Sequence, residues 1–148
     1  MKKFINNLTF AKILNIVTAL LIFVAIIITS VSNSVRGYGI NYFGLVITFS
    51  VIAFLAVALS AIFADKFKKS YIVDIALFIS MVFMMVCFAL VINSRTELIG
   101  TLWITALDSV NPLAVSAMNT GTASFVLYLL SALLILVSSF FNFKKASN

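Results

Sequence analysis

Four long apolar stretches dominate this chain and limit what it can fold into. They run over residues 13–31, 42–64, 71–92 and 124–143. Each is close to the length of about 20 residues that a helix needs to cross a bilayer. The 148 residues are 64% hydrophobic and 9% charged, which is more apolar surface than one small soluble core could bury. The sequence therefore predicts an all-α integral membrane protein, a single domain with a bundle of four transmembrane helices.

The ten basic residues lie between these stretches and predict how the protein is oriented. Eight of them fall on one side of the predicted membrane: Lys2, Lys3, Lys12, Lys66, Lys68, Lys69, Lys144 and Lys145. Only Arg36 and Arg95 fall on the other side. Because cytoplasmic segments carry the excess of lysine and arginine, we expect both termini and the loop 65–70 in the cytoplasm. The distribution of the basic residues that give the net charge of +6 is therefore explained by orientation in a membrane, and no nucleic-acid partner is expected.

The first stretch also resembles a signal peptide, with Ser30, Val31 and Ser32 as a small-residue cleavage site. Its apolar part is longer than the usual core of such a peptide, about 7 to 15 residues, and three further spans follow. We therefore interpret it as the first transmembrane helix.

The external loops are predicted at residues 32–41 and 93–123, and the second contains the apolar segment LIGTLWITAL, residues 98–107. This segment is too short to span a membrane and too apolar to stay in water, so we expect a short interfacial helical segment. Its candidate partner-contact residues are Leu98, Leu102, Trp103 and Leu107. The alternative is that they rest among lipid headgroups, where tryptophan is enriched.

The second external loop also carries helix signals. Asn111 and Pro112, after Asp108, are typical of a helix start, with asparagine as the cap and proline at the first helical position. Residues 119–121, Asn-Thr-Gly, are expected to end that short helix before the last span begins.

Each predicted span carries a stripe of small or polar residues at helical spacing. In chain order the stripes contain Asn15, Thr18, Ala25 and Thr29; Ala53, Ala56, Ser60 and Ala64; Ala76, Ser80 and Cys87; Ser124, Tyr128, Ser131 and Ser138. Membrane helices associate through such residues, so we interpret the stripes as inward packing faces. A polar pathway for a solute is the alternative, which the bulk of Ile22, Phe83 and Ile135 in the same stripes disfavours.

Asp74 is the one acid inside an apolar stretch. If its helix starts at Tyr71, a rise of about 1.5 Å per residue places Asp74 about 5 Å from the cytoplasmic end, in the first turn. Its face carries Met81, Met85 and Phe88, away from the small-residue stripe of that helix. We therefore interpret Asp74 as an acid at the edge of the membrane, with a proton or ion site as the alternative.

Catalytic, cofactor and metal sites find no support in the sequence. Histidine is absent, and the single cysteine, Cys87, lies in an apolar run. The acids do not pair, because Asp65 and Asp74 fall on the opposite side of the predicted membrane from Glu97 and Asp108. General acid–base catalysis needs histidine or two carboxylates in one site. We therefore expect no enzyme activity, no cofactor and no metal.

These observations leave two function classes. The first is a non-catalytic membrane protein that binds a membrane partner, as an accessory subunit, an assembly protein or an immunity-type protein. The alternative is an oligomeric transporter or channel subunit for a small molecule or ion. The layout resembles that of the small multidrug transporters in topology only, because those carry a glutamate in their first helix, where this chain has Asn15 and no acid. The composition is compatible with a bacterial plasma membrane.

Overall fold

Four helices make up the computed structural model, which describes residues 10–63, 70–105 and 111–141. They are α2 (Phe10–Ser34), α3 (Phe43–Phe63), α4 (Ser70–Thr105) and α5 (Pro112–Ser139). Each contains a segment that is long and apolar enough to cross a membrane. The prediction of an all-α protein with four helices long and apolar enough to cross a membrane is confirmed.

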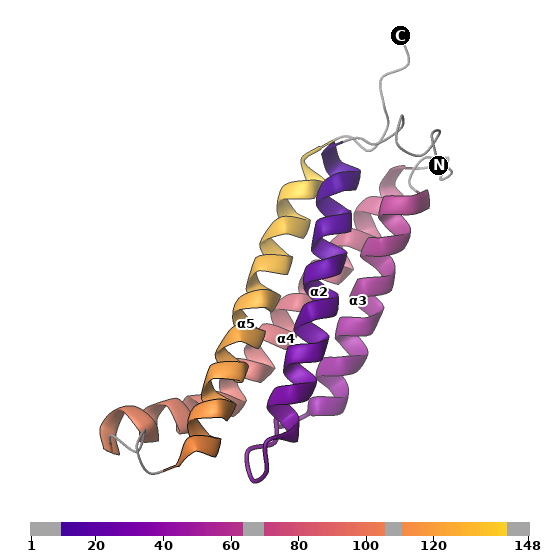
Figure 1. The fold of residues 1–148 in the computed structure, drawn as a ribbon. Helices are drawn as coiled ribbons and strands as arrows, with labels where there is room; N and C mark the ends of the chain where they lie inside the picture. The colour runs from indigo at the N-terminus through magenta and orange to yellow at the C-terminus, as the bar shows by residue number, and fades with distance from the viewer. Residues whose placement is uncertain (1–9, 64–69, 106–110, 142–148) are drawn as a thin grey trace.

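The helices surround a common core (Figure 1). α2 packs against α3 and α5, and α4 packs against the same two helices. The rings of Phe10, at the start of α2, and Phe141, just after α5, are 4.7 Å apart. The first and last helices therefore meet at one end of the bundle, which we call the terminal end. The opposite end, where α2 ends and α5 begins, is the loop end.

The predicted inward faces of α2 and α5 are confirmed residue by residue. Asn15, Thr18, Ala25 and Thr29 of α2, and Ser124, Tyr128, Ser131 and Ser138 of α5, are all buried. Ile22 and Ile135 are also buried, and they fill the interior between the small residues. In both helices, the polar stripe in an otherwise apolar sequence marks the core face.

The inward faces of α3 and α4 differ in part from the prediction. Ala56, Ala76 and Phe83 are only half-buried, whereas Ser60, Ser80 and Cys87 are buried as expected. Ala64 lies outside the described residues. The true faces also include Val46, Ser50 and Val57 of α3 and Val73, Leu77, Met84 and Val91 of α4. Phe83 stacks on Phe49 of α3 at 4.7 Å between ring centres, beside the core rather than in its middle.

The start of α5 matches the prediction, but its course does not. Asn111 caps the helix by accepting from the backbone N–H groups of Leu113 and Ala114, and Pro112 is in the first turn. The expected helix end at residues 119–121 is wrong, because α5 continues without a break to Ser139. Gly121 serves instead as a packing site: a Cβ atom there would lie 2.7 Å from Nε of Arg95 and 2.8 Å from its Cγ.

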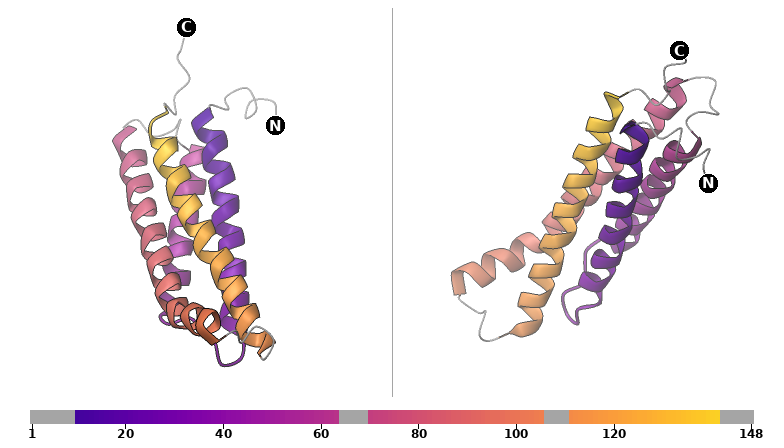
Figure 2. Two further views of the ribbon diagram at one scale, coloured as in Figure 1. Left: turned by 90° about the vertical axis from the view of Figure 1, so that its left-hand side faces the viewer. Right: turned by 45° about the horizontal axis from the view of Figure 1, so that its top comes forward.

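α4 is longer than the predicted span and has 36 residues. The segment apolar enough to cross a membrane covers Tyr71–Thr96, and the helix then continues to Thr105. The end of α4 turns sideways, away from the bundle, as Figure 1 and the right-hand view of Figure 2 show. We call residues 97–105 the extension. Residues 98–105 of the apolar segment expected in the second loop are therefore part of α4, and their placement at a membrane surface stays a prediction.

The close approach of α5 to Arg95 gives a test of the packing. Gly121→Ala should destabilise the fold by about 1 to 3 kcal/mol, because the added methyl group overlaps the middle of a side chain whose far end is hydrogen-bonded. Gly44→Ala, in α3, is the matched control, since a Cβ atom there meets nothing within 4 Å. The free energy of unfolding of both variants in detergent provides the measurement. Equal stabilities would contradict the packing described for Gly121.

Candidate functional site

A hydrogen-bonded cluster in the core joins all four helices. We call Thr29, Ser50, Cys87 and Tyr128 the central network. The Tyr128 hydroxyl lies 3.0 Å from Thr29 Oγ1 and accepts from Ser50 Oγ at 3.0 Å. Cys87 Sγ lies 3.5 Å from Ser50 Oγ and donates to the carbonyl of Val46 at 3.4 Å. One residue from each helix therefore contributes a side chain to a single network.

The side chains of the central network hold the four helices together. Each of its four side chains is fully buried and has a hydrogen-bond partner. In an apolar environment such bonds hold helices together, because an unpaired hydroxyl group there costs free energy. Cys87 is shielded in the core, so its thiol behaves as a small, weakly polar packing group. This arrangement supports the interpretation of the polar stripes as packing faces.

A second cluster lies at the loop end and is built on Arg95. Arg95 of α4 is 1% exposed. Its guanidinium donates to the carbonyl of Tyr38 at 2.7 Å, to the carbonyl of Ser32 at 3.0 Å and to Ser32 Oγ at 2.7 Å. Its aliphatic stem and Nε lie over Gly121. We call Ser32, Tyr38, Arg95 and Gly121 the Arg95 cluster; it joins α2, the loop after α2, α4 and α5.

Arg95 forms no ion pair with a carboxylate of the described residues, so another feature must offset its buried charge. Ser32 lies in the last turn of α2, where backbone carbonyls lack helical partners and the helix dipole is negative. The guanidinium supplies donors and positive charge at that position. Burying a charge is costly unless it is hydrogen-bonded, and here dipole and carbonyls stabilise it.

Sequence reasoning missed the role of Arg95 and counted it only as an orienting charge. A signal was present: Cys87, Val91 and Arg95 are spaced by four residues and share one buried face of α4. The predicted helix ended at Ile92, so Arg95 fell outside it. A predicted helix that continued one turn beyond Ile92 would have placed Arg95 on the inward face.

The loop end is held by further side-chain bonds to the segment between α2 and α3. Asn111 Nδ2 donates to the Tyr38 hydroxyl at 2.8 Å. The backbone N–H of Ile40 donates to Asn33 Oδ1 at 2.8 Å, and that of Asn41 donates to Ser94 Oγ at 3.1 Å. These contacts fix the first loop against α4 and the start of α5.

The predicted partner-contact residues lie on or just beyond the extension. Leu98 is half-buried, and the helical backbone of α4 includes Leu102 and Trp103. The side chains of Leu102 and Trp103, and all of Leu107, lie outside the described part of the chain. The extension begins two residues after Arg95, so the Arg95 cluster fixes its base. A role for these residues in partner binding stays a prediction.

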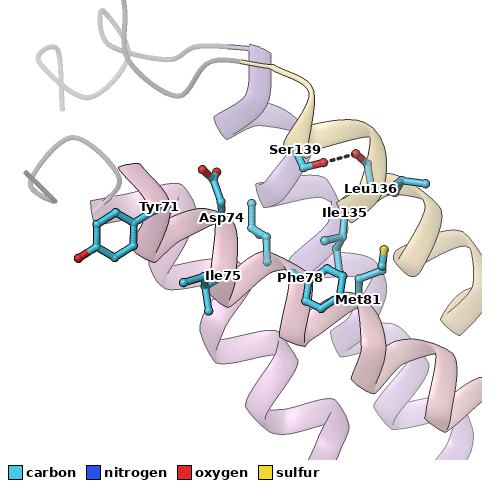
Figure 3. Close-up of a pocket in the computed structure, with 9 residues that line it drawn as sticks. Tyr71, Asp74, Ile75, Phe78, Met81, Ile135, Leu136 and Ser139 are labelled. Atoms are coloured by element: carbon cyan, nitrogen blue, oxygen red, sulfur yellow. Dashed lines mark hydrogen bonds between the residues drawn. The ribbon is translucent and has the colours of Figure 1, made fainter. Parts of the chain in front are cut away.

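Asp74 lies on the exposed side of α4, away from the core. The helix begins at Ser70, so Asp74 comes just after the first turn. It lines a groove of about 510 Å³ between α4 and α5, which we call the α4–α5 groove (Figure 3). The other lining residues are Tyr71, Ile75, Leu77, Phe78, Met81, Ile135, Leu136 and Ser139. The expectation that Asp74 faces away from the small-residue stripe fits this position.

Two polar residues of α2 are buried near the terminal end. Asn15 is fully buried, and neither polar atom of its amide has a hydrogen-bond partner among the described residues. Lys12, one turn earlier, is 4% exposed. Within the same described part of the chain, no group of three histidine, cysteine or acidic residues could hold a metal ion.

Comparison with known proteins gives no relative on which a function could be based. No family model, no curated protein and no solved structure matches the chain. The features of the molecule that bear on its function are the bundle, the Arg95 cluster and the extension.

The central network predicts the effect of removing one oxygen. Tyr128→Phe should lower the free energy of unfolding by about 1 kcal/mol, since it removes two hydrogen bonds between helices, each worth roughly 0.6 kcal/mol on average, while Thr29 and Ser50 keep their bonds to the carbonyls of Ala25 and Val46. Tyr42→Phe is the control, because Tyr42 is 67% exposed. If both variants unfold like the unmodified protein, the central network does not stabilise the bundle.

Proposed function

We propose that this chain is a non-catalytic membrane protein that binds another membrane protein, as an accessory subunit, an assembly protein or an immunity-type protein. The observation that carries the proposal is the extension. It continues α4 past the membrane-spanning segment and points away from the other helices (Figures 1 and 2). A helix that leaves its own bundle offers a surface to another molecule.

The base of the extension supports this proposal. Arg95 holds α4 to the end of α2 and to the first loop through three hydrogen bonds. Gly121 brings α5 against the same side chain. A binding element that is fixed before its partner arrives loses less conformational freedom on binding. The Arg95 cluster would therefore orient the extension for a partner.

The filled core favours this function over the alternative of an oligomeric transporter or channel. Ile22, Leu77, Met84 and Ile135 are each no more than 1% exposed and occupy the middle of the bundle. The hydroxyl groups of the central network bond to one another and to backbone carbonyls. A solute path through one bundle would require these contacts to open.

The proposed setting is a bacterial plasma membrane with both termini in the cytoplasm. The lysine-rich segments of the sequence adjoin the start of α2, the end of α3, the start of α4 and the end of α5. These four helix ends lie together at the terminal end (Figure 1), which favours that end as the cytoplasmic one. The extension would then lie at the outer surface. The sequence LIGTLWITAL is apolar there, and tryptophan is enriched among residues that dominate binding interfaces.

The test is a double substitution in the apolar segment. Trp103→Ala with Leu107→Ala should lower the recovery of a co-purifying membrane protein at least tenfold, since dominant interface residues contribute about 2 kcal/mol or more each. The matched control is Phe23→Ala with Leu20→Ala, which are 50% and 60% exposed on α2. Quantitative mass spectrometry after purification in mild detergent gives the measurement.

The two classes of function give different results in this experiment. Partner binding requires loss of the complex while abundance and membrane insertion stay normal. Survival of the complex, or failure to recover any partner with the unmodified chain, would contradict the proposal. Solute uptake by reconstituted vesicles containing only this protein would support the transporter instead.

A further inference from the structure

The α4–α5 groove has one polar end and one apolar end. Asp74 of α4 and Ser139 of α5 lie toward the terminal end, and Phe78 and Met81 lie further along (Figure 3). Its walls belong to the membrane-spanning parts of α4 and α5. Its volume of about 510 Å³ is within the range of about 300 to 1,000 Å³ that is typical of small-molecule sites.

The apolar walls of the groove are accessible from the side of the bundle. Ile75, Phe78 and Leu136 are 54%, 63% and 42% exposed. Because α4 and α5 span the membrane, these side chains face the lipid tails directly. A hydrocarbon chain from the bilayer can therefore enter the groove without passing through water.

The acid at the polar end sets the charge of the group that can bind there. Asp74 is exposed, and its carboxylate forms no hydrogen bond or ion pair with another described residue. The Ser139 hydroxyl, on the opposite wall, donates to the carbonyl of Leu136 at 2.7 Å. An ionised carboxylate only accepts hydrogen bonds, so it favours a cationic donor and disfavours an anionic group.

We propose that the α4–α5 groove binds a membrane phospholipid whose headgroup carries a primary amine. The ammonium group donates to Asp74, and one acyl chain lies along Ile75, Phe78, Met81 and Leu136. Such a lipid has a cationic amine at one end and a hydrocarbon chain at the other. The groove has the same order, with the acid Asp74 at its polar end and apolar side chains along its walls. This inference is independent of partner binding by the extension, which lies beyond the other end of α4.

The charge part of the proposal is tested by lipid binding to the full chain. Native mass spectrometry in detergent would compare phosphatidylethanolamine, phosphatidylcholine and phosphatidylglycerol at equal concentrations. We expect phosphatidylethanolamine to bind best, and Asp74→Asn to weaken its binding about two- to fivefold, the range for an exposed ion pair. Asp65→Asn is the control, because it removes the same charge from the segment between α3 and α4. Equal binding of the three lipids, or no effect of Asp74→Asn, would overturn the proposal.

The location is tested by photocrosslinking in native membranes. A benzophenone amino acid at Phe78, in the groove, should give a lipid adduct detected by mass. The same amino acid at Phe23, which is 50% exposed on α2, is the control and should give less of the amine-headgroup adduct. An adduct with a second copy of the chain or with another protein would show that protein occupies the groove. That result, or equal lipid adducts at both positions, would contradict the proposal.

Discussion

The guanidinium of Arg95 is buried at the loop end of the bundle, where it donates to two backbone carbonyls and one hydroxyl group. One of these carbonyls belongs to the last turn of α2, so the positive charge meets the negative end of a helix dipole. The same side chain lies against Gly121 of α5. The end of α2, the first loop, α5 and the start of the extension are therefore positioned by one residue of α4.

The central network supports the same arrangement from within the core. Lipid tails are as apolar as leucine, so apolar contact alone gives membrane helices little reason to associate. Tyr128 binds Thr29 and Ser50, and Ser50 lies beside Cys87, so each helix has a polar tie to another. Together, the two clusters hold the four described helices in a closed bundle, from which the end of α4 departs. The proposed partner surface and the proposed lipid groove use opposite ends of that helix.

The sequence predicted the four spans and the inward faces of α2 and α5, because there a polar stripe stands out from apolar neighbours. It predicted the inward faces of α3 and α4 less accurately. Both have apolar residues all around, so lipid-facing and core-facing positions such as Ile79 and Leu77 look alike in sequence. Asn119–Gly121 was misread as a helix end because glycine commonly follows helices. The reason for a glycine at position 121 is seen in the structure, where the Arg95 side chain leaves no room for a Cβ atom. The buried role of Arg95 depends on contacts with residues about 60 positions away, which a local pattern cannot show.

Comparison of the two arginines at this end of the protein tests the central claim most directly. Arg95→Met keeps most of the side-chain length but removes every donor, and Arg36→Met makes the same change at an exposed position. The measurement is the free energy of unfolding of each variant in detergent. We expect a loss of about 2 to 4 kcal/mol for Arg95→Met. Three hydrogen bonds to a charged group, each worth about 1.5 to 3 kcal/mol, are lost, but removing a buried charge recovers part of its desolvation cost. Arg36→Met should change the stability by no more than about 0.5 kcal/mol. Equal effects of the two substitutions would show that the buried guanidinium does not hold the loop end together.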